Sequence, residues 1–592
     1  MAIYDRLPAV WVQTTQGEKM PRHKGPRRAF LAALAMALVA AVTVSAAGAA
    51  RGNDQLSKIN HIVVIYEENH SFDNLYGGWE GVNGLANADA AHTAQVNQSG
   101  APYSCLLQLD VNLTVPPLTK VCDGTTPRGV DFSSHFLGNT WFTIDNFIGP
   151  DATTCPKPKD SFAFPNGIRD GSGVGIAGGC TRDLVHKFYQ EQYQLNGGAQ
   201  NRYATGSDSA GTVMGVYNTR ALPIYRYLHG DAHPHYAIAD NFFQAAFGGS
   251  FLNHQWLIAA RTPSDPNAPA AQHSLVDSEG FPRNTYPLYN PIVGATYRDG
   301  DFTVPCPSPK AGLACGNWAV NTMQPTNEPW GAFGDKLVVQ DSTTSPTIGD
   351  ELSTAGVSWG WYAGGWDNAA GNTLGSGWTN GSGPTCSDPN HDTNVVYHYP
   401  KCPDFAFQFH HQPFVYYSNY APGTAGRTHL RDETEFEHAA QTSTSQCNLD
   451  AVSFVKPIGE ENEHPGYASE SNGSTHLIDL LQMIGNSACA KDTMVVVTYD
   501  EFGGQWDHVP PPGQGNNNGP HDQWGPGTRI PALVISPFLR GNEVIDHTQY
   551  DTTSILALLE ERYSLGALSS RDAAVNSLSN VFAAKQYEAA GP

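Results

Sequence analysis

The sequence lacks several patterns that mark common classes of protein. It has no Cys-X-X-Cys pair, no heptad run and no internal repeat, which argues against a cysteine-rich zinc module, a coiled coil and a solenoid. Basic residues are scarce: 33 Lys and Arg stand against 56 Asp and Glu, giving a formal net charge of −23. Such a chain repels nucleic acid and anionic membranes on average, so a soluble substrate is favoured and no nucleic-acid partner is expected.

What is present indicates a large, loop-rich globular protein. The 592 residues are 40% hydrophobic and include 60 Gly and 41 Pro. The first 50 residues differ from the rest: "PRHKGPRRAFLAALAMALVAAVTVSAAGAA" has a basic start, an apolar run, and small residues that offer cleavage near Ala46 or Ala49. Residues 1–50 therefore predict a signal region. Arg27-Arg28 resembles a twin-arginine signal.

We expect export to the periplasm or beyond, with no stable membrane span once the signal is removed. A retained membrane anchor is the alternative, and Met20 is a second possible start. All ten cysteines follow this region, and an even number of cysteines in an exported chain predicts disulfides. Sequential pairing gives Cys105/Cys122, Cys155/Cys180, Cys306/Cys315, Cys386/Cys402 and Cys447/Cys489.

Two apolar stretches far apart in the chain end in pairs of acids. The run Ile62–Ile65 leads to Glu67 and Glu68, and the run Met494–Val497 leads to Asp500 and Glu501. Both runs predict buried strands, because β-branched residues fit a covered pleated surface. Parallel strands of an open α/β sheet present their carboxyl ends to one crevice, so these acids are expected to meet there.

Other segments complete an α/β pattern. A strand is expected within 528–538, helices within 183–194 and 551–564 (with Asp551 as the N-cap), and a helix, a strand, a glycine turn and a second helix across 222–260. Since the two acid-tipped strands are more than 400 residues apart, we expect one large domain, residues 51–592. Residues 262–400 are poor in helical pattern and predict loop-rich insertions or a cap.

The acid-tipped strands predict a metal site. Glu68, Asn69, Asp500 and Glu501 offer hard oxygen donors, which suit one divalent ion such as Mg, Ca or Mn and, where histidines join, Zn or Fe. A cation would neutralise carboxylates that have no local Lys or Arg. The alternative is that one of Glu67 and Glu68 is solvated while the other makes a structural ion pair.

A glycine turn in "AFGGSFLNHQW" places Ser250 where a helix can begin. Exposed N–H groups at such a turn attract anions, and Asn253 and His254 follow one turn later. Beside a metal ion, Ser250 is a candidate nucleophile and also a metal ligand. The commoner role of a serine at this position is to cap the helix.

Several histidines lie near acids or turns and are candidates for phosphate binding and for a general acid. They are His186, His410, His411, His464 and His508. A single histidine is more often a surface or satisfied core residue, and the pair Asp507-His508 could instead fix the turn before Pro510.

Together, "YEENHSFDNLYG", "FGGSFLNH" and "TYDEFGGQWDHVPPP", with "GTRIPALVISPF" and "DHTQYDTTSILALLEERY", resemble a family. It is the bacterial phosphoesterase family of exported acid phosphatases and non-haemolytic phospholipases C, within the alkaline-phosphatase-like superfamily. The resemblance runs from about residue 58 to 563. It implies a three-layer α/β/α sandwich and a Ser or Thr that becomes phosphorylated beside a metal ion.

Carried over by position, the resemblance assigns Glu68, Asn69, Ser250, Asp500 and Glu501 to the metal. His186, His411 and His464 would contact the phosphoryl group, with His410 competing with His411. The phospholipase C branch usually has Thr in a Pro-containing loop at the nucleophile, whereas this chain has Gly248-Gly249-Ser250.

The chain is therefore expected to be an acid phosphatase acting on phosphate monoesters through a phosphoserine. A histidine-lined site with one metal ion should work best in mildly acidic conditions. The alternatives are a phospholipase C acting on phospholipid head groups and a secreted binding module without activity.

Overall fold

The fold is seen in a computed structural model whose described residues are 54–97, 99–106, 123–125, 131–133, 139–146, 183–207, 210–276, 298–306, 312–331, 334–386, 397–404 and 406–588. They belong to one compact unit, Arg51–Pro592. The signal region predicted for residues 1–50 lies outside the described residues.

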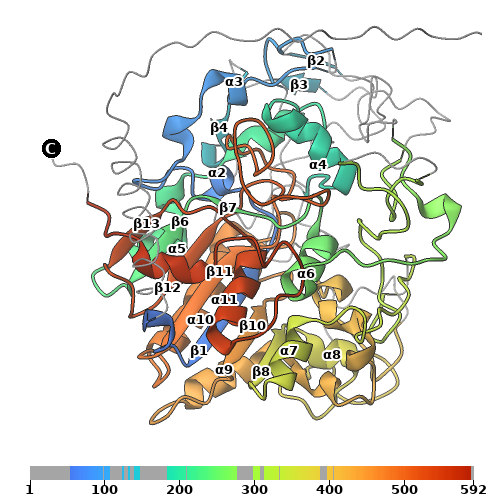
Figure 1. Cartoon of the computed structure of the whole chain (residues 1–592), viewed down its shortest axis with the longest axis vertical. Coiled ribbons are helices and arrows are strands. Elements are labelled where there is room, and N and C mark those ends of the chain that lie inside the picture. Colours follow the sequence, from blue (N-terminus) through green and yellow to red (C-terminus); the bar gives the residue numbers. More distant parts are fainter. Residues whose placement is uncertain are drawn as a thin grey trace, which may run out of the picture. The chain divides into compact units, whose positions relative to one another are not determined.

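The unit is built around one mixed sheet (Figure 1). Its strands lie in the order β13 (Glu543–Asp546), β6 (Tyr236–Ala239), β12 (Ala532–Ile535), β11 (Thr493–Tyr499), β1 (His61–Glu67), β10 (Val452–Lys456), β8 (Trp359–Ala363) and β9 (Leu430–Asp432). The strands from β11 to β9 run parallel, and β12 runs antiparallel to both of its neighbours.

The centre of the sheet is the most apolar part of the core. β1 pairs with β11 in the register Ile62↔Met494 to Glu67↔Tyr499, and residues 62–67 are fully buried. A strand covered on both faces reads as a continuous apolar run, which is how both strands appear in the sequence. The predicted strands and their parallel arrangement are confirmed.

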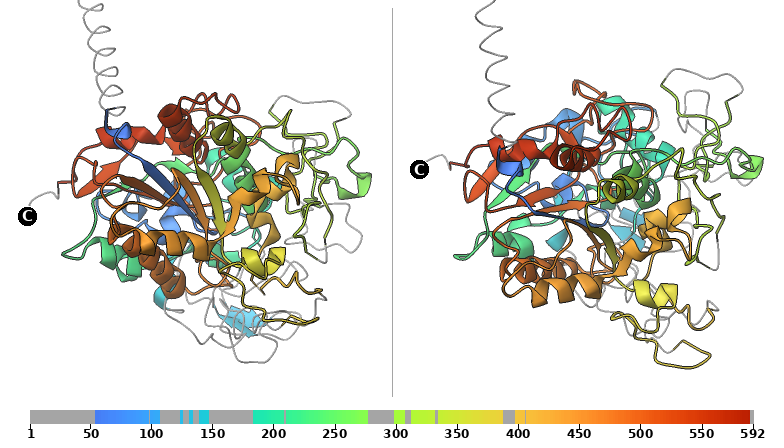
Figure 2. Two further views of the ribbon diagram at one scale, coloured as in Figure 1. Left: turned by 90° about the horizontal axis from the view of Figure 1, so that it is seen from below. Right: turned by 60° about the horizontal axis from the view of Figure 1, so that its bottom comes forward.

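Helices lie on both faces of the sheet, as Figure 2 shows. On one face are α5 (Pro223–Leu228), α9 (Glu433–Thr442) and α10 (Glu470–Gly485); on the other are α6 (Ser250–Ala259), α7 (Ile348–Thr354) and α11 (Thr553–Tyr563). Shorter or peripheral helices are α2 (Phe72–Leu75), α3 (Ala90–Thr93), α4 (Phe188–Leu195) and α8 (Trp366–Ala370). The fold is thus of the α/β class.

Among the described residues, three two-stranded pairs accompany the main sheet. They are β14 (Tyr550–Asp551) with β7 (Phe242–Phe243), β2 (Asp123–Thr125) with β3 (Asp131–Ser133), and β4 (Phe142–Thr143) with β5 (Gly215–Val216).

Local boundaries differ from expectation at two helices. The helix expected over 183–194 begins only at Phe188, because the preceding residues turn back toward the glycine loop before Ser250. The N-cap of α11 is Thr552 rather than Asp551, although Asp551 Oδ1 accepts hydrogen bonds from the backbone N–H and the hydroxyl of Thr553.

The segment 262–400 is less uniform than its sequence suggests. It contains α7 and β8, and β8 pairs with both β10 and β9. Residues 348–370 therefore form part of the sheet and its covering helices. β8 reads WGWYA, which lacks the β-branched run that identified the other strands.

Three of the predicted disulfides are present: Cys306–Cys315, Cys386–Cys402 and Cys447–Cys489. The other two predicted couples include Cys122, Cys155 and Cys180, which lie outside the described residues. Within the part of the chain that the structure describes, no helix combines the length and hydrophobicity that crossing a bilayer requires.

Candidate active site

The register of the central strands brings the two acidic motifs together. Because Glu67 lies opposite Tyr499, the next residues of both chains leave the sheet side by side. The backbone N–H of Asp500 donates to Glu67 O at 3.1 Å, and that of Asn69 donates to Asp500 Oδ1 at 3.0 Å. Asn69 adopts φ +61°, a conformation that asparagine tolerates better than most residues.

A tight glycine loop brings Ser250 to these acids. Gly248 has φ +89°, and a Cβ there would meet the backbone of Phe188 at 2.8 Å. A Cβ on Gly249 would meet the ring of His186 at 2.9 Å. Only glycine fits both positions without displacing these neighbours. Gly249 is the N-cap of α6, so Ser250 is its first residue, and the capping role considered for Ser250 is wrong.

The hydroxyl of Ser250 lies among the oxygen atoms predicted to bind a metal. Its Oγ is 3.1 Å from Glu68 Oε2, 3.4 Å from Asn69 Oδ1 and 3.5 Å from Glu501 Oε1. Asp500 completes the group through its hydrogen bond with the backbone of Asn69. Residues separated by up to 433 positions in the chain therefore share one small volume.

This group has the chemistry of a divalent-cation site. Glu68, Asp500 and Glu501 are fully buried, and burial is the main cause that raises the pKa of all three carboxyls. Asp500 Oδ2 is buried without a hydrogen-bond partner. Buried carboxylates need protons or a cation to compensate them, and four oxygen-bearing side chains around a hydroxyl are the donor set that hard cations prefer.

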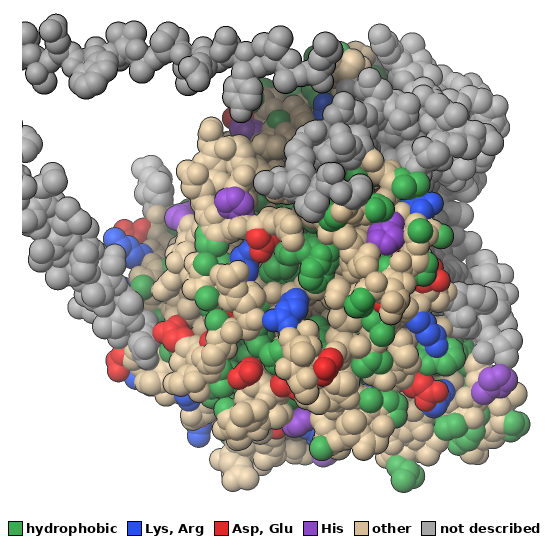
Figure 3. Space-filling view, turned by 45° about the vertical axis from the view of Figure 1, so that its right-hand side comes forward, with side chains coloured by type: hydrophobic (Ala, Val, Ile, Leu, Met, Phe, Trp, Pro, Cys, Tyr) green, Lys and Arg blue, Asp and Glu red, His purple; other side chains and the backbone are tan. Residues whose placement is uncertain are grey.

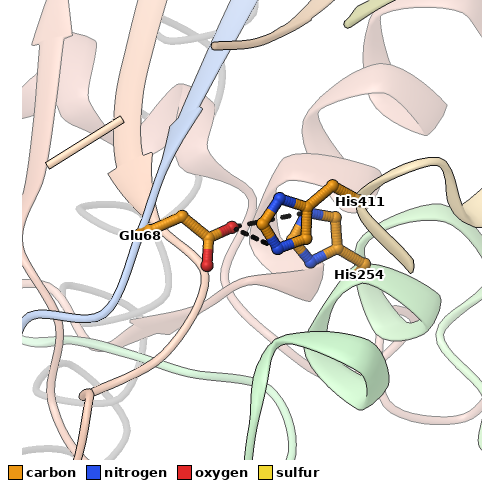
Figure 4. Close-up of side chains that lie close together, drawn as sticks. All are labelled: Glu68, His254 and His411. Atoms are coloured by element: carbon orange, nitrogen blue, oxygen red, sulfur yellow. Dashed lines mark ion pairs between the residues drawn. The ribbon is translucent and has the colours of Figure 1, made fainter. Parts of the chain in front are cut away.

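Two histidines face Glu68 Oε1 (Figure 4). Nε2 of His411 lies 3.2 Å from Glu68 Oε1, and Nε2 of His254 lies 3.8 Å from the same atom. The two rings are parallel, with centroids 4.9 Å apart. Nδ1 of His254 lies 2.8 Å from the carbonyl oxygen of Ser250, so Nδ1 donates and Nε2 carries the lone pair.

Burial changes the expected role of the histidines. It lowers the pKa of His254, His411 and His464 well below the usual value and that of His410 to about 3. These rings are therefore neutral in mildly acidic solution. Transfer from water thus disfavours the imidazolium at these positions, and their contact with a phosphoryl group stays a prediction.

His186 occupies a different setting. Its side chain is 20% exposed, Nε2 lies 3.4 Å from Glu501 Oε1, and Nδ1 lies 2.5 Å from Leu184 O. His464 is buried, with Nδ1 2.8 Å from Pro465 O. His186 is thus the more solvent-accessible of the two and adjoins the acidic group directly.

Asn253 holds the glycine loop. Its Oδ1 accepts from the N–H of Ala246 at 3.0 Å, and its Nδ2 lies 3.0 Å from Ala246 O and 3.3 Å from Gly248 O. With both ends of the amide engaged by the backbone, this geometry favours a supporting role for Asn253 over the predicted contact with phosphate.

Lys456 is a site residue that the sequence did not reveal. It ends β10, is 1% exposed, and places Nζ 2.5 Å from Glu68 Oε1 and 2.8 Å from Tyr66 O. No Lys or Arg lies near Glu68 in the sequence, and β10 brings this distant lysine to it. Glu67 is buried, and neither of its carboxylate oxygens has a hydrogen-bond partner, so the alternative of one solvated acid is wrong.

Glu191 is a second site residue that the sequence did not reveal. It is fully buried, and its carboxylate accepts from the N–H groups of Gly248 and Thr528 at 2.5 and 2.7 Å. Burial raises its pKa to about 7. It fixes the loop that presents Ser250. Lys456 and Glu191 are each a charged residue in an otherwise buried segment. That pattern can be recognised only when the pairing of the strands is known.

A second polar centre is built from the same two motifs. Asp73 accepts from the His508 ring at 2.5 Å and from Arg529 at 3.1 Å, while Asp507 accepts from Asp73 N and from Arg529 Nε at 3.0 and 3.1 Å. The ring partner of His508 is thus Asp73, not Asp507. This cluster is structural, because a guanidinium compensates both carboxylates.

The chain shares these motifs with known proteins. The sequence profile described as "Phosphoesterase family" matches residues 59–566. Phospholipase C B of Mycobacterium tuberculosis is 24% identical over 606 residues, which cover 96% of this chain and 87% of that protein. Shorter matches include Non-specific phospholipase C6 of Arabidopsis thaliana, 28% identical over 20% of this chain and 26% of that protein. Another is Non-hemolytic phospholipase C of Burkholderia pseudomallei, 28% identical over 21% of this chain and 20% of that protein.

These matches identify the protein as a hydrolase acting on phosphoric ester bonds. The chain belongs to the phosphoesterase family.

Proposed function

We propose that the protein is an exported, metal-dependent phosphatase that hydrolyses phosphate monoesters through a phosphoserine at Ser250. The proposal includes an alkaline-phosphatase-like α/β/α sandwich. The observation that carries it is the position of Ser250 Oγ within 3.5 Å of oxygen atoms from Glu68, Asn69 and Glu501. A buried serine with a purely structural role does not need several carboxylate and amide oxygens around its hydroxyl.

One divalent cation fits the group formed by Glu68, Asn69, Ser250, Asp500 and Glu501. When bound, it would offset the buried carboxylates and lower the pKa of the serine hydroxyl. Mg, Ca, Mn, Zn and Fe are the candidate ions.

The chain's own residues supply the remaining steps. Ser250 first loses its hydroxyl proton to solvent and regains one when it is released. Its Oγ forms a bond to phosphorus while the ester P–O bond breaks, and the leaving alkoxide takes a proton from His186. Water then attacks the phosphoserine, gives its proton back to His186, and releases Ser250 and inorganic phosphate. His410 and His411 are assigned as neutral hydrogen-bond donors to the phosphoryl oxygens, whereas His464, whose Nδ1–H donates to Pro465 O, is assigned to accept a phosphoryl O–H at Nε2.

Charge favours a monoester. With a divalent ion, the carboxylates of Glu68, Asp500 and Glu501 and the ammonium of Lys456 sum to zero, whereas without Lys456 the sum is −1. A phosphate monoester carries two negative charges above its second pKa of about 6, but a diester carries one. Lys456 therefore adds the attraction that a dianion needs most.

A phospholipase C is the second candidate, because Phospholipase C B is similar along nearly the whole chain. A phosphodiester with a diacylglycerol leaving group would require room beside the site, which residues 262–400 could shape as a cap. Export is proposed on the signal-like residues 1–50 and on three disulfides, which persist in oxidising compartments.

The test compares p-nitrophenyl phosphate with its phosphorylcholine ester. A monoesterase should hydrolyse the first with at least a tenfold higher kcat/KM, and the reverse order supports phospholipase C. Ser250→Ala should lower kcat about 10⁴-fold or more on the preferred ester. Ser554→Ala, in the first turn of α11, is the matched control and should retain activity. Equal rates for wild type and Ser250→Ala would rule out Ser250 as the nucleophile.

A further inference from the structure

A second group of potential metal ligands adjoins Ser250. Glu68, His254 and His411 each offer one ligand atom, and these atoms lie within 4.8 Å of one another. All three residues are buried, and Nε2 of both histidines lacks a hydrogen-bond partner. Two imidazole nitrogens and one carboxylate oxygen are a common set of protein ligands for a catalytic zinc ion.

The same oxygen already has a cationic neighbour. Lys456 Nζ lies 2.5 Å from Glu68 Oε1, closer than either histidine nitrogen. The ammonium cannot leave this position easily, because it also donates to Tyr66 O at 2.8 Å and its side chain is only 1% exposed. A cation bound to Glu68 Oε1 at a distance of about 2 Å would compete with it for the same space and repel it.

The two oxygens of Glu68 consequently face different partners. Oε2 faces Ser250 at 3.1 Å, on the side of the proposed metal ion, whereas Oε1 faces Lys456 and the histidine pair. This division holds the carboxylate plane in one orientation. Lys456 comes from β10 and Glu68 from the end of β1, adjacent parallel strands paired up to Ile65↔Val455, so the backbone fixes their approach.

We propose that Lys456 is a built-in cation that occupies the place of a second metal ion, so that the wild-type site binds one divalent ion. Lys456 is then a positioning residue: it orients Glu68 and supplies one positive charge without touching the reacting atoms. The proposal rests on the proposed metal-dependent function, but it does not depend on whether the substrate is a monoester or a diester.

The experiment counts bound ions. Metal-free full-length protein, with its disulfides intact, is saturated with Co²⁺, freed of excess ion and analysed for metal per chain, and its visible absorption is recorded. Wild type should hold one ion. Lys456→Ala, which empties the space beside Glu68 Oε1, should hold two, with added absorption from imidazole-ligated Co²⁺. Lys456→Arg keeps the charge and should hold one.

His411→Ala in the Lys456→Ala background should return the count to one, because it removes a ligand of the second ion only. If Lys456→Ala does not fold, Lys456→Ser offers the same space with a polar group. Two ions in wild type would overturn the proposal, as would one or none in both small variants, or two in the double variant. If the wild-type protein did not hydrolyse p-nitrophenyl phosphate, that result would instead count against the proposed function, since the number of bound ions is independent of substrate.

Discussion

Two polar centres arise from the same pair of motifs and differ in one respect. The centre around Ser250 contains Glu68 and Asp500, and the centre around Arg529 contains Asp73 and Asp507. All four acids are fully buried. In the second centre Arg529 contacts both carboxylates, whereas in the first Asp500 Oδ2 has no hydrogen-bond partner. Burial alone therefore does not separate the two centres; whether every carboxylate oxygen has a hydrogen-bond partner does.

The largest expected effect is at the compensated centre. Arg529→Met should cost about 5 kcal/mol of unfolding free energy, because it leaves Asp73 and Asp507 buried and unpaired. Urea unfolding measures this loss. Arg562→Met is the control. This arginine is partly buried and donates to a single carbonyl, Ile59 O at 2.8 Å, so its replacement should lower the unfolding free energy by only about 1 kcal/mol. Equal losses would remove the distinction between the two centres.

A matched pair of substitutions compares the centres directly. In metal-free protein, Asp507→Asn should cost about 3 kcal/mol, since it breaks a paired charge. Asp500→Asn should leave stability unchanged or raise it, because it removes a carboxylate whose pKa is raised by burial. With divalent metal added, the order of Asp500→Asn and wild type should reverse. Thermal unfolding with and without chelator decides this, and a large loss for metal-free Asp500→Asn would contradict it.

The smallest effect concerns a third buried acid, Glu433, whose partner can lose its charge. His476 Nε2 lies 2.9 Å from Glu433 Oε1, and Glu433 raises the pKa of His476 to about 10 against the opposing effect of burial. A raised pKa stabilises the fold fully below the ordinary value of about 6.5, and that stability is lost as pH rises through about 10.

The stability difference between wild type and His476→Gln should thus be about 1–2 kcal/mol at pH 6 and should shrink toward pH 10. Urea unfolding at several pH values measures it. A difference that grows with pH would show that His476 is neutral in the folded protein.

Much of the central sheet was predictable from the sequence. The strands β1 and β11 were identified because both faces of each are covered, which produces uninterrupted β-branched runs. The meeting of Glu68 and Asp500 followed from the parallel arrangement, and the resemblance to the phosphoesterase family placed Ser250 beside them. β8 was not predicted, because its aromatic and glycine residues resemble a loop in composition.

The missed features depend on pairing between distant segments. Lys456 looks like an ordinary lysine after a strand until β10 is placed beside β1. Asn253 was assigned to phosphate from its distance to Ser250 along the helix, but its amide is directed at the loop backbone. On the face shown in Figure 3, the basic side chains of the described residues are scattered rather than gathered into a patch.

The strand order also determines when, during synthesis of the chain, the site can form. β1 is made early, yet both strands beside it, β10 and β11, begin at Val452 and Thr493. Closing such long loops slows folding, so a nascent chain cannot assemble the acids around Ser250 until most of it has been synthesised. The group around Ser250 is therefore completed late, and binding of the proposed metal ion would report that the central strands have come together.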